Sequence, residues 1–294
     1  MSQQSQEQYQ FISAILAKHI GVTATIDDLQ FFYGGNFNLA VRVKSGKSEY
    51  FIKWTQGEHQ GLFEAEAKNL ALIHHSGAID VPGVLGVGSH DEKEYLMMDC
   101  IQSAEKSTHY WSDFGGKLAH LHQQHATQGH GLSYDNFLGA AKQINSWELD
   151  GVQFFIQNRL KKQVDNAIYH RRISAEMEAQ FESLYEKLPQ LIPNESSSLL
   201  HGDLWSGNAM VNAKGEITLV DPCTYFGLRE VELAFTTMFG GFPTEFYEAY
   251  HRTFPIEKDF HKRIPLYNLY PLMVHVNLFG EGYLPAVNKI LSSY

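Results

Sequence analysis

The sequence predicts an α+β fold of two lobes, with a small antiparallel sheet followed by a larger, mainly helical part. Strand patterns separated by glycine-containing turns dominate the first hundred residues, whereas helical spacings dominate from Trp111 onward. With 294 residues, of which 44% are hydrophobic, the chain can build a core in each lobe. We expect the first lobe at 1–98, a hinge at 99–103 and the second lobe at 104–294.

The first lobe is predicted element by element from its periodicity. Residues 5–19 place apolar side chains on one helical face, and 29–54 alternate as an antiparallel meander with strands at 39–43 and 50–54. Residues 62–74 favour a helix that Gly77 and the Val-Pro-Gly segment at 81–83 end, before a further strand at 95–98.

The second lobe is predicted as amphipathic helices. Asp113 is an expected N-cap for a helix that carries Phe114, Leu118 and Leu121 on one face, and further helices are expected at 150–170 and 174–188. The aromatic-rich residues 264–283 favour a core helix, with a substrate wall as the alternative. A hairpin interrupts this helical half.

That hairpin brings two oxygen ligands together. Residues 209–211 and 217–220 alternate as strands around the turn Ala213-Lys214-Gly215. Counting outward from the turn pairs Asn212 with Glu216 and sets Asn208 opposite Val220. Asn208 and Asp221 therefore meet at the open end, roughly 5 Å apart.

The residues around the hairpin match the spacing of a kinase catalytic loop. The run from His201 through Asp203 to Asn208 has the H-x-D-x-x-x-x-N spacing, and Asp221 ends the next strand. In that interpretation Asn208 and Asp221 hold Mg²⁺ on the nucleotide phosphates, while Asp203 accepts the proton of the acceptor hydroxyl. The alternative is that Asp203 and Asn208 only cap a turn. The hairpin and Asp221 favour a protein-kinase-like fold.

The first lobe offers the lysine and the glutamate that such enzymes need. Lys53 shares a strand face with Phe51, as required of a lysine that contacts phosphates. On the next helix, Glu66 lies on the apolar stripe and Glu64 does not. A carboxylate on that stripe is costly unless paired, which favours Glu66 with Lys53; a solvated Glu66 on a rotated helix is the alternative.

Two weaker signals remain open. Gly34, Gly35 and Asn36 lie between two strands, so their backbone amides are candidates for phosphate contacts, although a simple turn fits equally well. The chain also has 15 histidines, none in H-E-x-x-H spacing. Surface or packing roles are favoured over zinc binding.

Composition restricts the partners. Acidic residues outnumber basic ones by 33 to 23, for a net charge of −10, and no Lys/Arg cluster marks a nucleic-acid surface. Two cysteines, Cys100 and Cys223, suit a reducing compartment, so we expect the cytoplasm. No segment approaches the roughly 20 apolar residues of a membrane span, and the polar N-terminus suggests no export signal.

The run HGDLWSGN followed by VDPCTYFGLREVELAFTTMFGGF resembles the fructosamine kinase (ketosamine-3-kinase) family, which is related to aminoglycoside and choline phosphotransferases. GGNFN, FIKW, FEAEAKNL, NFLGAAKQIN, FFIQNRL and RIPLYNLYPLMVHVNLFGEGY extend the resemblance over the whole chain. It implies ATP-dependent phosphorylation of the 3-hydroxyl of ketosamines, which promotes deglycation. It also implies ATP and Mg²⁺ as cofactors and a sugar amine or glycated amine as partner. We expect a monomer.

Carried over residue by residue, the resemblance makes Asp203 the base and Asn208 and Asp221 the Mg²⁺ ligands. It makes Lys53 and Glu66 the phosphate-positioning pair. The adenine hinge is then Asp99, Cys100 and Ile101.

The chain departs from the family pattern in places. Glu232 stands where the family usually has Asp, Cys223 where Ala is common, and Gly151 where a Trp is usual. These departures bear on the substrate pocket and local packing more than on the reaction. Some relatives have a redox-active Cys at the place of Asn36, so we do not expect that control here.

Two other functions stay open: a kinase for another small alcohol, such as an aminoglycoside or a choline-like amine, and a catalytically silent nucleotide-binding protein. Trp205, two residues after Asp203, offers a flat aromatic face suited to a sugar and argues against the first. The presence of Lys53, Asp203, Asn208 and Asp221 argues against the second.

Overall fold

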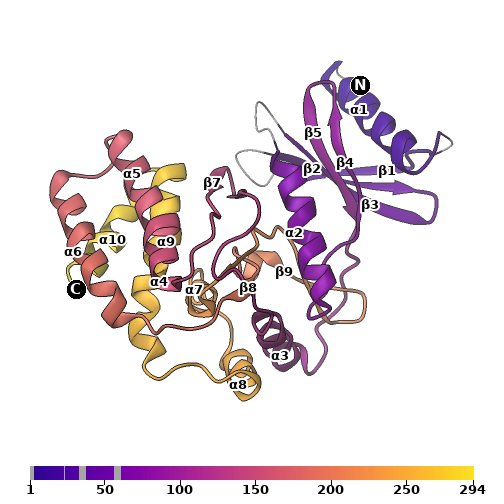
Figure 1. Cartoon of the computed structure of the whole chain (residues 1–294). Helices are drawn as coiled ribbons and strands as arrows, with labels where there is room; N and C mark the ends of the chain where they lie inside the picture. Colours follow the sequence, from indigo (N-terminus) through magenta and orange to yellow (C-terminus); the bar gives the residue numbers. More distant parts are fainter. Residues whose placement is uncertain (1–2, 23, 33–37, 56–60) are drawn as a thin grey trace.

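The computed structural model of the chain describes residues 3–22, 24–32, 38–55 and 61–294. The sheet lies at the N-terminal end of the molecule and most of the helices lie at the other end, so that the two termini are far apart (Figure 1). The predicted two-lobe α+β fold is confirmed.

The first lobe is built on one antiparallel sheet with the strand order β1-β2-β3-β5-β4. In chain order its strands are β1 (Asp28–Phe32), β2 (Asn38–Ser45), β3 (Ser48–Thr55), β4 (Val84–His90) and β5 (Lys93–Asp99). The register sets Ala40 opposite Lys53 and Lys53 opposite Leu96. Lys53 therefore lies on a central strand of the sheet.

Two helices cover opposite faces of this sheet. Helix α1 (Gln3–His19) packs Phe11 and Ile15 against Met97 of β5. Helix α2 (Leu62–Ser76) packs Phe63 against Leu96, the neighbouring residue on the same strand. Successive side chains of a strand point to opposite faces, so α2 lies on the face that also carries Lys53.

One strand of the sheet and the start of the first helix after it differ from the sequence prediction. Strand β4 was not predicted, because Gly86 and Gly88 dilute its alternation and its exposed edge position leaves little apolar pattern. Helix α3 (Tyr110–His122) begins before Asp113, whose amide already donates to the backbone oxygen of His109 at 2.8 Å. Asp113 is therefore not the N-cap. Tyr110 is buried with the aromatic core, and this packing extends the helix upstream.

The second lobe consists mostly of packed helices, and the helices predicted at 150–170, 174–188 and 264–283 are confirmed. The first of these contains a π-helical stretch (Phe155–Leu160). Helix α9 (Phe260–Phe279) runs through the main apolar cluster of the lobe. Helices α5 (Lys161–Tyr169) and α10 (Leu284–Leu291) contact α9, and α4 (Gly151–Phe154) and α6 (Ala175–Leu191) contribute to the same cluster. Helix α8 (Thr244–Thr253) packs against α3 instead.

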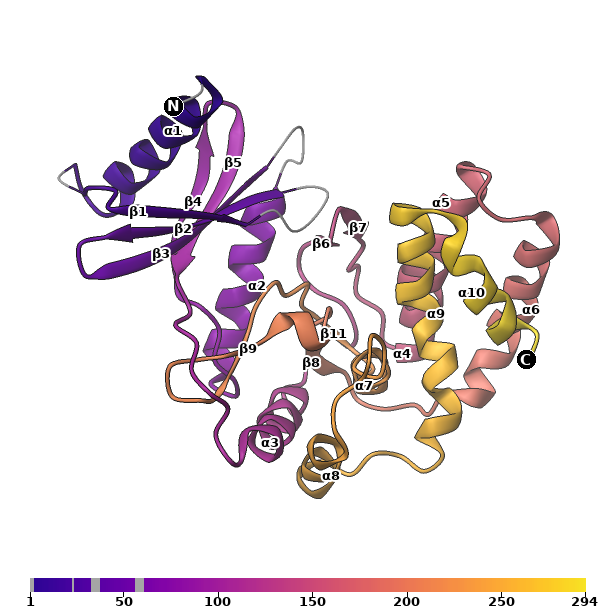
Figure 2. The ribbon, with the colours of Figure 1, turned by 180° about the vertical axis from the view of Figure 1, so that it is seen from behind.

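Three short strand pairs of the second lobe lie between the sheet and most of the packed helices (Figure 2). The backbone amide of Leu219 donates to Asp80 at 2.9 Å, which ties one pair to the end of the sheet lobe. The pairs are β6 (Asn136–Leu138) with β7 (Ala141–Gln143), β8 (Ser198–Leu200) with β11 (Tyr225–Gly227), and β9 (Ala209–Val211) with β10 (Ile217–Leu219).

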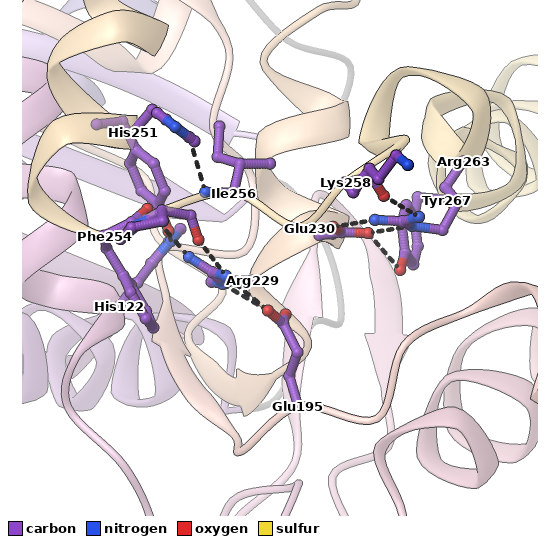
Figure 3. Close-up of polar contacts among 12 residues, drawn as sticks. His122, Glu195, Arg229, Glu230, His251, Phe254, Ile256, Lys258, Arg263 and Tyr267 are labelled. Carbon is purple, nitrogen blue, oxygen red and sulfur yellow. Dashed lines mark hydrogen bonds and ion pairs between the residues drawn. The ribbon is translucent and has the colours of Figure 1, made fainter.

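Helix α7 (Arg229–Phe235) is buried along its whole length. Charges in such a position are costly unless paired. Arg229 donates to Glu195 at 2.6 Å, and Arg263 donates to the buried Glu230 at 2.6 Å (Figure 3). The two pairs fix the helix on both sides, and with it Glu232.

Strand β5 ends at Asp99 and α3 begins at Tyr110, with no helix or strand assigned between them. The predicted hinge at 99–103 lies in this connection, and the lobe boundaries remain predictions. None of the helices in the described ranges has the length and apolar character needed to cross a bilayer.

Candidate active site

The loop after β8 carries the predicted catalytic residues. It leads into one turn of 3-10 helix, η2 (Ser206–Asn208). The side-chain nitrogen of Asn208 donates to the carboxylate of Asp203 at 3.0 Å and to the backbone oxygen of Asp203 at 2.8 Å. Asn208 therefore closes the turn, as the alternative interpretation expects, and also fixes the carboxylate of Asp203.

The hairpin β9–β10 has the predicted register. The amide of Asn212 donates to Glu216 at 2.8 Å, and the amide of Val220 donates to Asn208 at 3.1 Å. Asn208 and Asp221 thus lie at the same open end. Asp221 leaves the strand with φ of 56°, in the left-handed region that Asp tolerates better than most residues.

Gly202 brings the catalytic loop against the segment that follows Asp221. Its φ is +89°, and a Cβ atom there would lie 2.2 Å from the backbone oxygen of Cys223. The amide of Cys223 in turn donates to the backbone oxygen of His201 at 2.9 Å. Only glycine permits this approach, which fixes the distance between the loop and the segment.

Glu232 of α7 holds the backbone of the catalytic loop. Its carboxylate accepts from the amide of Gly202 at 2.6 Å and from the amide of His201 at 3.2 Å, and His122 contacts it at 2.8 Å. Burial opposes ionisation of Glu232, but the hydrogen bond with His122 and the bonds from the backbone outweigh it and lower the pKa of this carboxyl. A charged, fully bonded Glu232 therefore anchors the loop.

The environment of Asp203 suits a general base. Burial and, next, the charge of Asp221 raise the pKa of Asp203 to about 7, and the hydrogen bond from Asn208 partly offsets them. A base works best when its pKa lies near the operating pH. At neutral pH Asp203 can take a proton without being permanently protonated.

Lys53 lies between two carboxylates. Its Nζ donates to Glu66 at 2.8 Å and also to Asp221. Burial alone would lower the pKa of Lys53, but the nearby charges of Asp221 and Glu66 raise it above its usual value. The predicted pairing of Lys53 with Glu66 is present, and it joins β3 to α2.

A cavity of about 790 Å³ opens beside the sheet. Phe51 and Lys53 line it from β3, and the predicted hinge residues Asp99, Cys100 and Ile101 also line it. Its size suits a nucleotide. The candidate phosphate-loop residues Gly34, Gly35 and Asn36 lie outside the described residues.

Two further cavities share lining residues with the first. One of about 130 Å³ is bounded by Lys53, Glu66, Asp203 and Asp221. Another of about 300 Å³ also has Asp203 in its wall, together with Leu138, Gly139, Trp205, Phe235, Phe239, Val274, His275, Leu278 and Phe279. Asp203 therefore faces both the carboxylate and lysine cluster and a largely aromatic cavity.

Trp205 lies in the wall of that aromatic cavity. Its ring packs edge-on against Phe239, with the ring centroids 5.7 Å apart. The ring centroids of Phe239 and His275 are in turn 5.5 Å apart. The helix predicted at 264–283 is thus mainly core, and its last two turns also form this wall.

Asn208 and Asp221 are chemically suited to hold Mg²⁺. The Asn208 nitrogen is engaged by Asp203, which leaves its side-chain oxygen as a possible ligand beside the Asp221 carboxylate. Amide and carboxylate oxygens, completed by phosphate oxygens and water, are the ligands that Mg²⁺ prefers.

Several contacts around the candidate site are not predicted from the sequence. Glu232 departs from the family pattern, and the structure shows that this longer acid reaches the loop backbone. Phe239 and His275 are not predicted either, since neither belongs to a spaced motif. Gly151 leaves no room for a larger side chain, because a Cβ there would lie 2.5 Å from His130.

The sequence matches the family model described as fructosamine kinase over residues 8–294. A curated relative, the probable ketoamine kinase of Lactiplantibacillus plantarum, is 37% identical over 92% of this chain and 95% of its own length.

Two solved structures are similar to this chain over nearly its whole length. A putative fructosamine-3-kinase from Haemophilus somnus superposes with a TM-score of 0.86 at 27% identity, over 96% of both chains. A thermostable mutant of the aminoglycoside phosphotransferase APH(4)-Ia superposes with a TM-score of 0.65 at 18% identity, over 96% of this chain and 98% of its own. The similarity to the aminoglycoside phosphotransferase concerns the fold alone.

Proposed function

The chain belongs to the fructosamine kinase family, and we propose that it transfers the γ-phosphate of ATP to the 3-hydroxyl of a ketosamine with Asp203 as the general base. One observation carries the proposal. Asp203, with a pKa of about 7, lies in the wall of both the carboxylate and lysine cluster and the aromatic cavity. A hydroxyl in the aromatic cavity can thus meet the base and a phosphate in the neighbouring chamber.

The transfer assigns a distinct task to each residue. Asp203 accepts the hydroxyl proton as the acceptor oxygen bonds to the γ-phosphorus and the bond to the ADP oxygen breaks. Lys53, held by Glu66, positions the phosphates. Asn208 and Asp221 would hold Mg²⁺, which neutralises phosphate charge when bound. Asp99, Cys100 and Ile101 would receive the adenine.

The aromatic cavity is the proposed acceptor site. Trp205 lines this cavity, and the apolar face of an indole ring suits the C–H side of a sugar. The 3-phosphate formed there is expected to release its amine, which is the basis of deglycation. We expect a small sugar amine or glycated amine as the substrate, and a monomer. We also expect the protein to act in the cytoplasm, since both of its cysteines are unpaired, as suits a reducing compartment.

The lining of the aromatic cavity argues against an aminoglycoside. An acceptor with several ammonium groups needs a cluster of carboxylates. Among the described residues that line this cavity, Asp203 is the only acid. A silent nucleotide-binding protein would not need a carboxylate in the wall of both the lysine and carboxylate cluster and the aromatic cavity.

The test is an ADP-production assay with Mg²⁺ and ATP over ribulose- and fructose-derived amines, kanamycin and choline. We expect kcat/KM for a ketosamine to exceed that for kanamycin or choline at least tenfold, a difference of about 1.4 kcal/mol. A higher value for kanamycin or choline would refute the acceptor assignment.

Trp205→Ala should erode this preference mainly through the ketosamine, because the substitution removes the stacking face. Trp147→Ala is a control, since Trp147 packs against Phe226 and lines neither the nucleotide cavity nor the aromatic one. Unchanged ketosamine kinetics in Trp205→Ala would show that the ring does not contact the sugar.

A further inference from the structure

The segment directly after Asp221 is held by three buried side-chain amides. Asn69 donates to the backbone oxygen of Pro222 at 2.8 Å, and Gln143 donates to that of Cys223 at 3.0 Å. Asn136 donates to the backbone oxygen of Thr224 at 2.7 Å. Three successive carbonyls thus each receive one amide hydrogen bond.

The three amides come from both lobes. Asn69 belongs to α2 and lies one turn after Glu66, whereas Asn136 and Gln143 belong to the β6–β7 hairpin. That hairpin lies between α2 and α9 in both views (Figures 1 and 2). The segment after Asp221 therefore joins the helix that carries Glu66 to the second lobe.

The amides also bind one another. Asn136 donates to Asn69 at 3.3 Å, and Gln143 donates to Asn136 at 2.7 Å. Tyr134 donates to Asn69 at 3.1 Å, and Tyr270 donates to Gln143 at 2.8 Å. The three amide side chains are almost fully buried. A buried network in which each member is bonded is rigid, because any displacement leaves a polar group without a partner.

The backbone of Asp221 depends on such support. A left-handed conformation costs free energy even for Asp, which tolerates it better than most residues, and it persists only where the surroundings impose it. The catalytic loop packs on the same carbonyls, since Gly202 lies against Cys223. A shift of residues 222–224 would move Asp221, Gly202 and α2 together.

We propose that Asn69, Asn136 and Gln143 form an amide clamp on residues 222–224 that positions the Asp221 carboxylate for the metal. The three amides are positioning residues, since they act through Asp221. The inference rests on the proposed function, in which Asp221 holds Mg²⁺.

The test uses Asn69→Ala and Gln143→Met in the full chain, because each removes a different bond to the same segment. Asn158→Ala and Gln163→Met are matched controls. Both controls remove buried amides of the second lobe, bonded to Ser146 and Asn277 respectively, and neither amide reaches residues 222–224.

The measurement is the affinity for AMP-PNP by titration calorimetry, with and without Mg²⁺. In both clamp variants the gain in affinity that Mg²⁺ confers should fall about tenfold, as for other residues that orient a metal ligand. Affinity without Mg²⁺ should stay within about twofold, and both controls should keep the full gain. Amide hydrogen exchange at 223–226 should be faster only in the clamp variants.

The outcomes separate the inference from the function on which it rests. A full Mg²⁺-dependent gain in the clamp variants, or an equal loss in the controls, would overturn the clamp. Failure of both clamp variants to fold, with both controls folded, would show that the amides act on stability alone. Absence of the gain in the wild type would instead overturn the metal site itself.

Discussion

At the scale of single residues, the proposed chemistry depends on the environment of Asp203. Removing its carboxylate takes away the proposed proton acceptor and leaves Lys53 and the predicted hinge residues, which line the nucleotide cavity, in place. We expect Asp203→Asn to lower kcat about 10² to 10⁴-fold and to leave AMP-PNP affinity nearly unchanged. Single-turnover kinetics and calorimetry would measure the two quantities, and a wild-type kcat would refute the role.

The melting temperature of the Asp203→Asn variant is the control, because it shows whether a loss of kcat comes from unfolding. A raised pKa means that the folded chain binds more protons than the unfolded chain between the two pKa values. The free energy of unfolding therefore falls as pH rises toward 7, so the charged Asp203 costs stability at pH 8. The variant should melt no lower than the wild type at that pH.

Asp203 should also set the acid limb of the pH profile. With a pKa of about 7, the carboxylate is mostly protonated below that pH and cannot accept a proton. We expect log kcat/KM to fall with a slope of about one per pH unit below this pKa. A ketosamine assay from pH 5 to pH 9 would measure it, and a flat profile down to pH 5 would contradict the assignment.

At the scale of elements, the pair of Lys53 on β3 and Glu66 on α2 is the contact to which we assign the positioning of the phosphates. Lys53→Met should lower activity about 10²-fold or more, because the phosphates lose their positioning charge. The melting temperature should fall little, since Glu66 lines a cavity and can take up a proton.

Activity per folded molecule and thermal denaturation separate the two effects. Lys161→Met is the control, since Lys161 pairs with Glu182 on the surface of the second lobe. A large drop in melting temperature with activity retained would mean that Lys53 and Glu66 are a structural pair.

At the scale of the whole molecule, the nucleotide cavity has walls from both lobes, since Lys53 of β3 and Met210 of the β9–β10 hairpin both line it. Bound nucleotide should therefore stabilise the entire chain. At about 100 times its Kd, AMP-PNP with Mg²⁺ should add about 2.7 kcal/mol to the free energy of unfolding.

Thermal shifts with and without EDTA would measure this stabilisation. In Asp221→Asn the shift should need a higher Mg²⁺ concentration, because one ligand oxygen is lost. The same Mg²⁺ dependence in Asp221→Asn as in the wild type would mean that the hairpin is structural only.

The sequence alone determined the parts of the site that depend on near neighbours. The turn at 213–215 sets the hairpin register, and register follows from hydrogen bonds between residues close in the chain. The sequence thus predicts that Asn208 and Asp221 lie at the same end of the hairpin. Helical periodicity likewise selected Glu66 over Glu64, because side chains three and four residues apart share a face.

Only the tertiary structure decided the contacts that join distant segments. Glu232 reaches the loop because α7 is buried and fixed by two ion pairs, and the aromatic cavity arises where Phe239 meets His275. Asn69 meets Pro222 across 153 residues. No local pattern encodes such pairs, since their distances depend on how helices and strands pack once their apolar faces are buried.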